Sequence, residues 1–431
     1  MVWGGRSPAR PGITTRQPAG PEDTGHRDTL PGLMAKRSIT DIDVTGKRVL
    51  TRVDFNVPVD AGGRITDDRR IRMALPTLRS VLERGGRLVL MSHRGRPKGT
   101  GFEADFTLEP VAGRLGELLG TPVAFVAGEC AGAESAAAAA RLEDGQTLLL
   151  DNLRFDPGEK KGDADFAARL AAMGDVYCND AFGTAHRSHA SMVAVPAAMP
   201  DAPHVAGLLL QKELTYLADT LAAPARPFVA VLGGAKVSDK LGAIEHLAGV
   251  VDAVLVGGAM AYTFLAARGE GIGSSLLESE RLDDARVLLE GGSVEIVLPE
   301  DHVCAQSIAE GVETRTVVGA IPDGWMGLDI GPATAAAYAA RLQAARTIVW
   351  NGPMGVFEVN PFGAGTEAVA RAIGVATGTG ATTIIGGGDS AAAVERLGLQ
   401  EAFSHVSTGG GASLQMLEGR LFESVSMLDE A

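Results

Sequence analysis

The sequence has 431 residues, of which 45% are hydrophobic, and a formal net charge of −14. The apolar share excludes a disordered chain, the length predicts two or three domains, and the acidic balance argues against nucleic acid or an anionic membrane as a partner. Glycine is in excess, with 56 residues where average usage predicts about 30. No collagen-like repeat or Gly/Ser tract accounts for this surplus, so we expect the glycines at particular backbone positions.

The first segment, residues 1–33, is rich in Gly and Pro and has no hydrophobic periodicity, which predicts a disordered extension. Met34 is a plausible alternative start, because patterned sequence begins after it. No stretch of about 18 uncharged apolar residues is present, so no membrane span is expected. The three cysteines, Cys130, Cys178 and Cys304, are too widely spaced for a paired framework and indicate a reducing compartment, most simply the cytoplasm.

From residue 47 onward, short apolar runs alternate with longer amphipathic stretches. The runs are continuously hydrophobic, as is typical of strands covered on both faces in a parallel sheet. The expected strands are residues 47–53, 87–91, 147–150, 228–232, 252–256, 294–298, 346–350 and 381–385. Because this alternation exceeds what one sheet usually holds, we predict an α/β fold of two domains, each a parallel sheet flanked by helices.

A segment bracketed by prolines separates the third and fourth expected strands. Four leucines recur in it at helical spacing: Leu210, Leu214, Leu217 and Leu221. We interpret residues 206–221 as one helix that joins two lobes, although the pattern alone also permits a surface helix of a single large domain. The lobes would then comprise residues 34–205 and 222–405, followed by a C-terminal segment, residues 406–431.

Cations gather after the expected strands of the first half. In an open parallel sheet, ligands bind beyond the carboxyl ends of the strands. Arginine forks match phosphate and carboxylate groups, so the set predicts a site for a small molecule that carries both, although any one of them alone is more often a surface ion-pair partner. The set comprises Arg70, His93, Arg94, Arg96, Lys98, Arg154, His186, Arg187 and His189.

In the segment RVDFNVP, Asp54 and Asn56 lie on the same side of an extended chain. They could accept hydrogen bonds from substrate hydroxyls, or they could cap a turn before Pro58.

Glycines concentrate after the strands of the second half, in LGGAKVSDK, VGGAM, NGPMGVFE and GGGDS. There, backbone N–H groups can approach an anion, and a following helix adds a favourable partial charge. These turns predict a nucleotide site, although neither a P-loop nor a dinucleotide fingerprint is present.

Charged residues near these turns have two interpretations each. Asp389 could cap the helix after the glycines or bind Mg²⁺. Lys236 and Lys240 would share one face if helical, and could reach phosphates or remain solvated. Glu358 could bind ribose hydroxyls or be a surface carboxylate.

Ten segments in order, from about residue 36 to 430, resemble the phosphoglycerate kinase family. Ala194 and Ala259 stand where glycine is usual in that family, and Ser390 replaces a frequent threonine; Ala259 would narrow the nucleotide pocket. The matching segments are RVDFNVP, ITDDRRIR, LMSHRGRPKG, LLLDNLRF, DVYCNDAFGTAHRSHASMV, LGGAKVSDK, GWMGLDIGP, IVWNGPMGVFE, TIIGGGDS and HVSTGGGAS.

The resemblance implies two Rossmann-like lobes around a central cleft with a hinge, and a chain end that returns to the first lobe. It places 3-phosphoglycerate or 1,3-bisphosphoglycerate on Asp54, Asn56, Arg70, His93, Arg96, Arg154 and Arg187. It places MgADP or MgATP on Lys236, Lys240, Gly258, Gly327, Asn351, Glu358, Gly387, Gly388, Asp389 and Ser390, with Asp389 at the metal.

The implied activity is the glycolytic, reversible transfer of a phosphoryl group between 1,3-bisphosphoglycerate and ADP. Because the nucleophile is already an anionic oxygen, catalysis should consist of positioning and charge neutralisation, with Arg70 and Lys236 at the transferred group after hinge closure. Two alternatives remain. One is a non-catalytic nucleotide sensor on the same fold; the other is an NAD-dependent dehydrogenase, although the sequence lacks the dinucleotide-binding fingerprint of that class. We expect small-molecule partners only and a monomer.

Overall fold

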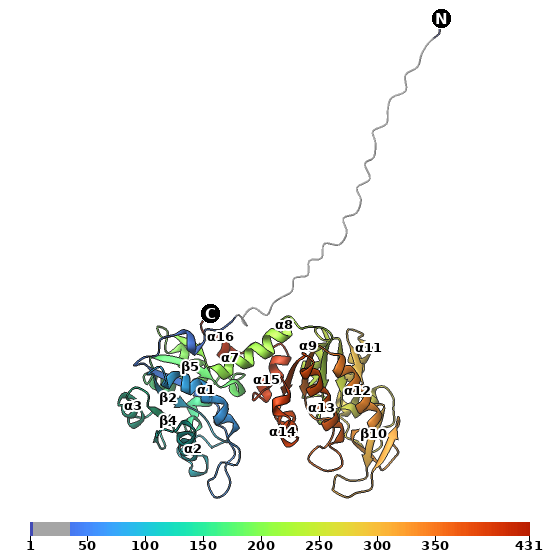
Figure 1. The fold of residues 1–431 in the computed structure, drawn as a ribbon, viewed down its shortest axis with the longest axis horizontal. Coiled ribbons are helices and arrows are strands. Elements are labelled where there is room, and N and C mark those ends of the chain that lie inside the picture. The colour runs from blue at the N-terminus through green and yellow to red at the C-terminus, as the bar shows by residue number, and fades with distance from the viewer. Residues whose placement is uncertain (3–34) are drawn as a thin grey trace.

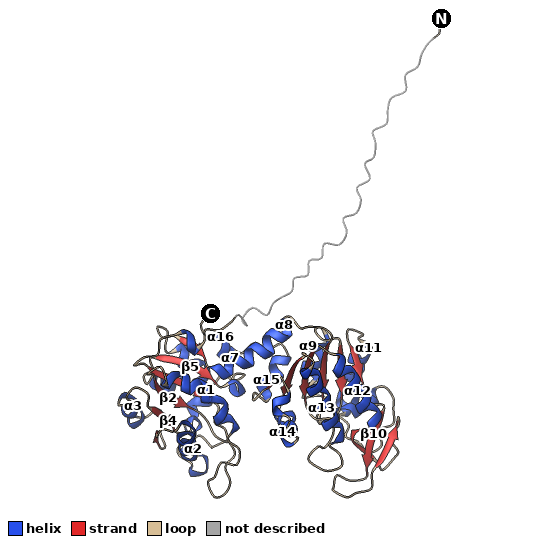
Figure 2. Cartoon of the chain, in the orientation of Figure 1, coloured by secondary structure: helices blue, strands red, loops and turns tan. Residues whose placement is uncertain are grey.

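The computed structural model describes residues 1–2 and 35–431, so the expected disordered extension, residues 1–33, lies outside the described residues apart from Met1 and Val2. The chain forms two α/β lobes joined by a helical segment (Figure 1). Helices cover both faces of the central sheet in each lobe (Figure 2). The predicted fold class, two parallel-sheet lobes flanked by helices, is confirmed.

The first lobe contains a six-stranded sheet in the order β3-β4-β2-β1-β5-β6, and all its strands are parallel. The strands are β1 (Arg48–Val53), β2 (Arg87–Met91), β3 (Val123–Val126), β4 (Thr147–Leu150), β5 (Val176–Asp180) and β6 (His204–Ala206). The helices are η1 (Ile39–Asp41), α1 (Arg69–Leu82), η2 (Ala104–Phe106), α2 (Glu109–Leu119), α3 (Ala133–Ala140), η3 (Leu153–Phe155), α4 (Pro157–Lys161), α5 (Ala164–Ala171), η4 (Phe182–Thr184), η5 (Ala190–Ala194) and α6 (Val195–Ala197).

The second lobe contains a six-stranded parallel sheet in the order β15-β14-β13-β7-β8-β9, together with a three-stranded antiparallel sheet in the order β11-β10-β12. The strands are β7 (Phe228–Leu232), β8 (Ala253–Val256), β9 (Glu295–Val297), β10 (Asp301–Ala305), β11 (Arg315–Val318), β12 (Met326–Ile330), β13 (Thr347–Asn351), β14 (Thr382–Gly386) and β15 (His405–Val406). The helices are α9 (Leu241–Ala248), α10 (Met260–Ala267), η7 (Ser279–Arg281), α11 (Leu282–Glu290), α12 (Pro332–Ala344), α13 (Ala364–Gly378), α14 (Gly388–Arg396) and η8 (Gln400–Ala402).

All eight expected strands are present, within one or two residues of their predicted bounds. The expectation missed β3, β5, β6 and β15 and the whole antiparallel sheet. These strands are short, lie at a sheet edge, or carry polar residues: β3 is an apolar run of only four residues at an edge, and β5 ends in Asn179 and Asp180, which are both buried. Their pairing depends on neighbours that are distant in the sequence, so local hydrophobicity does not reveal them.

The segment between the lobes is helical from residue 208 to residue 222. It consists of α7 (Leu208–Leu214), a π-helical stretch η6 (Thr215–Asp219) and α8 (Thr220–Ala222). All four leucines that predicted this helix are buried, and they belong to one apolar cluster that includes core residues of both lobes. The helix is thus packed into the interior and is not an ordinary surface helix.

The chain end crosses back to the first lobe after β15, through α15 (Gly411–Leu417) and α16 (Glu423–Ser426). Lys36 Nζ donates to Glu430 Oε1 at 2.6 Å, and Asp429 N donates to His204 O at 2.9 Å. Where the chain crosses, the buried carboxylate of Glu213 on α7 bonds to His405 Nε2 at 2.8 Å and accepts from Thr408 N at 2.8 Å. The two lobes are therefore linked by two segments of the chain, the helical segment and the C-terminal segment, and by buried polar contacts.

Within the described part of the chain, no helix combines the length and the apolar character needed to cross a membrane.

Candidate active site

The cations predicted at the strand ends of the first lobe lie together at the edge of its sheet. Asp54 and Asn56 follow β1, His93 and Arg96 follow β2, Arg154 lies on η3 directly after β4, and Arg187 follows η4 after β5, while Arg70 stands in the first turn of α1. Their convergence follows from parallel topology, since the carboxyl ends of all these strands meet at one edge. We call these seven residues and Arg52 the basic cluster.

Asp54 and Asn56 organise this cluster from within. Asp54 forms an ion pair with Arg70, and its Oδ1 lies 4.0 Å from His93 Nδ1. Asn56 Oδ1 accepts from Gly95 N at 2.8 Å, and Arg154 Nη1 donates to Gly95 O at 2.7 Å. The carboxylate and the amide therefore hold the loop and the guanidinium groups in place, whichever substrate contacts they also make.

Positive charge in the basic cluster exceeds what its own carboxylate balances. Burial, with Arg187 and Arg52 nearby, lowers the pKa of Arg154 to about 10. Burial also lowers the pKa of Arg187, and Arg52, Arg96 and Arg70 lower it further, whereas Asp54 raises it. Cations that are crowded and partly desolvated in this way are stabilised by an anion. The cluster is thus a site for a ligand with more than one negative charge.

In the second lobe, a cavity of about 470 Å³ opens at the corresponding edge of the sheet. Four predicted nucleotide residues line it: Gly258, Gly327, Glu358 and Asp389. Ala259, which stands where the related family usually has glycine, also lines it. Gly258 has φ +66°, and a Cβ there would overlap the backbone of Gly234, so only glycine allows the chain to pass.

Apolar side chains form the rest of this cavity, and they were not expected from the sequence. Leu276 and Ile308 line it although about half of each side chain is exposed, together with Met326, Leu328 and Val356. Exposed aliphatic residues on a cavity wall suit a flat, apolar ligand face such as a purine base. Met326 and Leu328 come from β12 and Val356 from the turn after β13, whereas Leu276 and Ile308 come from loops that no glycine-rich turn marks in the sequence.

The other predicted nucleotide residues occupy three different environments. Lys240 Nζ hydrogen-bonds to Asn351 Oδ1, beside Gly387, which has φ +88°. Gly388 is exposed at the start of α14. Lys236 is exposed, and it makes no hydrogen bond or ion pair to another described residue. The condition for a shared helical face is not met, because both lysines precede α9, which begins at residue 241.

Asp389 and Ser390 resolve two further expectations. Asp389 lies in the first turn of α14 but makes no capping hydrogen bond, so it does not cap the helix. Ser390 is fully buried, and its Oγ accepts from Gly352 N at 2.6 Å. Its side chain therefore ties the start of α14 to the turn after β13, and this buried hydroxyl is already used within the protein.

The donor set fits a Mg²⁺ ion that is carried by a nucleotide. Among the described residues, no group of three His, Cys, Asp or Glu could enclose a metal. Asp389 is one exposed carboxylate at the cavity, and Mg²⁺ at such sites typically takes one or two carboxylates, substrate phosphates and water.

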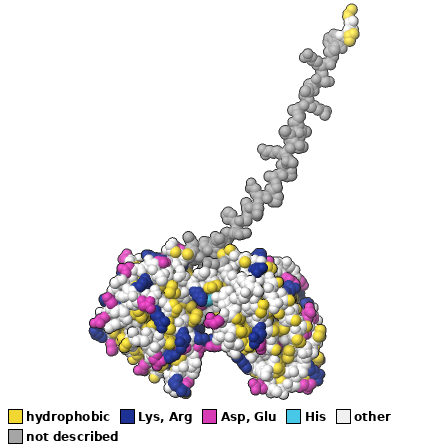
Figure 3. All heavy atoms as spheres, viewed as in Figure 1, with side chains coloured by type: hydrophobic (Ala, Val, Ile, Leu, Met, Phe, Trp, Pro, Cys, Tyr) yellow, Lys and Arg dark blue, Asp and Glu magenta, His cyan; other side chains and the backbone are white. Residues whose placement is uncertain are grey.

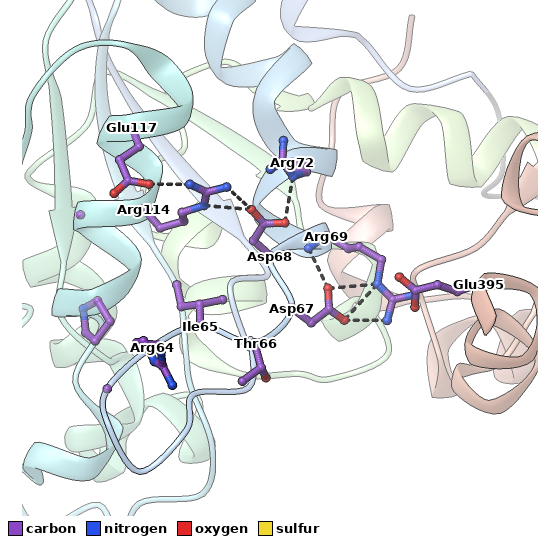
Figure 4. Close-up of a pocket in the computed structure, with 13 residues that line it drawn as sticks. Arg64, Ile65, Thr66, Asp67, Asp68, Arg69, Arg72, Arg114, Glu117 and Glu395 are labelled. Carbon is purple, nitrogen blue, oxygen red and sulfur yellow. Dashed lines mark hydrogen bonds and ion pairs between the residues drawn. The ribbon is translucent and has the colours of Figure 1, made fainter. Parts of the chain in front are cut away.

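Between the lobes, a cavity of about 820 Å³ is lined from both sides (Figures 3 and 4). Arg69 on α1 pairs with Glu395 on α14 at 2.6 Å across the lobes, and also with Asp67. Asp68 accepts from Arg72 and Arg114 (Figure 4). Because these charges are already paired with one another, this part of the cleft offers no unmatched positive charge to an anion.

The fold and the site together define a class: a two-lobed α/β protein in which one lobe gathers cationic side chains at its sheet edge and the other surrounds a cavity with glycine-containing turns. The family model described as "PGK: Phosphoglycerate kinase" matches residues 39–420.

Relatives and solved structures agree with this match. A phosphoglycerate kinase of Rhodopirellula baltica is 56% identical over 401 residues, covering 92% of this chain and all of that protein. One from Rubrobacter xylanophilus is 56% identical over 400 residues, covering 92% and 99%. The structure of phosphoglycerate kinase from Coxiella burnetii has a TM-score of 0.81 and 39% identity, covering 91% of this chain and 98% of its own.

The chain belongs to the phosphoglycerate kinase family. It is an enzyme that transfers a phosphoryl group reversibly in glycolysis, and the alternative of a non-catalytic nucleotide sensor is not favoured.

Proposed function

We propose that the first lobe binds 3-phosphoglycerate or 1,3-bisphosphoglycerate and the second lobe binds MgADP or MgATP, and that the phosphoryl group passes across the cleft between them. The observation that carries this assignment is the contrast between the two facing sites. The basic cluster suits an acid that bears phosphate and carboxylate groups, whereas the glycine-lined cavity has the apolar wall that a purine requires.

In the direction of ATP consumption, a carboxylate oxygen of 3-phosphoglycerate attacks the γ-phosphorus and the bond to ADP breaks. No proton has to be removed, because the nucleophile is already an anion. Arg70 and Lys236 are the cations proposed to meet the transferred group, since Lys236 is exposed and Arg70, although paired with Asp54, remains partly exposed. Bound Mg²⁺ would neutralise phosphate charge, with Asp389 as its protein ligand.

The division of the two substrates between lobes requires the lobes to approach each other and to exclude water. We propose that the helical segment over residues 208–222 and its ends act as the hinge. Its π-helical stretch η6 is an irregularity of the kind that often marks a functional position in a helix.

We infer that the enzyme works in the cytoplasm as a monomer. The three cysteines are unpaired and buried, as expected in a reducing compartment. Sedimentation velocity at micromolar concentration tests the oligomeric state, and a dimer would contradict it.

The proposal is tested by a coupled assay that follows ATP-dependent phosphorylation of 3-phosphoglycerate by the full chain. We expect turnover that requires Mg²⁺, ATP and 3-phosphoglycerate together. ATP binding without turnover would instead support a nucleotide sensor.

A further inference from the structure

A charged side chain, Arg52, is completely buried in the central strand of the first lobe. It lies on β1, where every residue from Val49 to Val53 is buried, and its exposed fraction is 0%. Its Nη1 donates to Val53 O, and its Nη2 lies 3.1 Å from His93 Nδ1. A buried guanidinium is costly unless its donors and its charge are matched, so its partners show what the position requires.

The charge of Arg52 is matched through a serine. Arg52 Nε donates to Ser191 Oγ at 2.9 Å, and Ser191 Oγ donates to Glu159 Oε1 at 2.7 Å. Ser191 N also donates to Glu159 Oε2 at 3.0 Å. Glu159 is itself fully buried, and although burial alone would raise its pKa, His189, Arg52 and Ser191 lower it. The ionised carboxylate is therefore the counter-charge of Arg52.

The contact between Arg52 and His93 determines where the imidazole carries its proton. A guanidinium has only donors, so Nη2 must donate and Nδ1 must accept. Neutral imidazole has one N–H group, which must then be on Nε2. A protonated ring would direct an N–H group at the guanidinium, and burial together with Arg52, Arg154, Arg187 and Arg70 lowers the pKa of His93 well below its ordinary value.

We propose that Glu159 and Ser191 act through Arg52 as positioning residues that hold His93 as the neutral Nε2–H tautomer. His93 thereby offers an uncharged hydrogen-bond donor to the acidic substrate, among arginines that supply the charge. Within the described part of the chain, Nε2 has no hydrogen-bond partner, so this donor is free for a ligand oxygen. The substrate contact of His93 rests on the proposed function, whereas the tautomer does not.

The tautomer is measured directly in the unmodified enzyme by ¹⁵N NMR of histidine-labelled protein, with His93→Gln to assign the signals. At neutral pH we expect His93 to show an unprotonated Nδ1 and a protonated Nε2. A protonated Nδ1, or a doubly protonated ring, overturns the proposal without the need for any other variant.

The positioning role is tested with Ser191→Ala, which breaks the link between Arg52 and Glu159. We expect mixed tautomers of His93 and a KM for 3-phosphoglycerate that rises roughly 10-fold, as for loss of a hydrogen bond to a charged group, with kcat and the KM for ATP little changed. Ser191→Thr keeps the hydroxyl and should restore both readouts. Ser135→Ala is the matched control, because Ser135 is also fully buried and donates to a backbone carbonyl, Glu129 O, at 2.8 Å.

If Ser191→Ala resembles Ser135→Ala in both tautomer and KM, the positioning role is overturned. His93→Gln could leave the KM for 3-phosphoglycerate unchanged while the wild-type tautomer is as expected. That result would overturn the proposed substrate contact of His93, but not the role of Glu159, Ser191 and Arg52 in setting its tautomer.

Discussion

The two lobes expose the same edge of a similar parallel sheet to the cleft, yet they offer anions different chemistry. The first lobe presents side-chain cations, among them Arg154, Arg187 and Arg70, the last of which is paired with Asp54. The second lobe presents backbone turns whose glycines, such as Gly258, adopt conformations and close approaches that no other residue permits. Similar topology therefore does not determine which groups a lobe presents at the edge of its sheet.

The physical costs of the two solutions differ. Clustered arginines repel one another and need buried counter-charges, which Glu159 supplies to Arg52 through Ser191. Backbone N–H groups carry no net charge, so the second lobe needs no such network, but its chain path tolerates no Cβ at the tightest turns. Charge is the vulnerable property of the first lobe, and backbone shape is that of the second.

The largest effect is expected at Lys236, where the second lobe depends on a side chain. Lys236→Ala should lower kcat about 100- to 1,000-fold, the usual loss for one donor to a transition-state charge, with modest changes in both KM values. Steady-state kinetics measures this, with Lys161→Ala, another exposed lysine, as the control. Unchanged turnover would remove Lys236 from the mechanism.

Arg154→Ala tests the basic cluster of the first lobe. We expect the Kd for 3-phosphoglycerate to rise about 10- to 100-fold, as for loss of a charged hydrogen-bond partner, and the Kd for ADP to stay the same. Isothermal titration against each ligand separately checks this. An equal loss for both ligands would argue against the division between lobes.

Gly258→Ala tests the glycine-lined cavity of the second lobe, where ADP binding should be affected and 3-phosphoglycerate binding should not. The substitution forces a side chain into φ +66°, which costs about 1–2 kcal/mol, and sets its Cβ against Gly234. ADP affinity and the melting temperature should fall, while 3-phosphoglycerate binding should remain. Gly249→Ala in the same lobe is the control, since its φ is −84° and a Cβ would meet nothing closer than 3.7 Å. Normal ADP binding by a stable Gly258→Ala protein would contradict the backbone role.

The last expectation concerns a property that the lobes share and that does not involve the substrates. Burial raises the pKa of Asp180 in the first lobe and of Asp329 in the second to about 7, from an ordinary value of 3.8. Between about pH 4 and pH 7 the folded protein binds more protons than the unfolded chain, so these groups make stability fall as pH rises, by at most about 1.4 kcal/mol per pH unit each.

Denaturant unfolding across that pH range measures this effect. Asp180→Asn and Asp329→Asn should each make the dependence shallower by a similar amount. A slope that neither substitution changes would show that these carboxyls are ionised throughout.

Many residues of the candidate site were predictable because they follow apolar runs that mark strands in the sequence. His93, Arg96 and Arg154 follow apolar runs directly, and so do the glycines of the second lobe, so strand-end placement and parallel topology together bring them to the cleft. Arg52 does carry a local signal, because a charged residue that follows the apolar pair Val49–Leu50 in a central strand requires buried partners. Leu276 and Ile308 gave none, because a loop leucine carries no local mark of the cavity it lines.

By itself, the sequence determined the two parallel-sheet lobes, the helix between them and the family, since these depend on hydrophobic period, strand-end residues and long matching segments. Only the tertiary structure decided that Lys236 and Lys240 precede α9 and are not part of it. It also decided that the Ser390 hydroxyl accepts a hydrogen bond from Gly352 N, and that the carboxylate of Glu159 is the counter-charge of Arg52. The physical reason is distance along the chain: local pattern specifies what each segment can form, but a hydrogen bond between residues 52 and 191 exists only once the fold has brought them together.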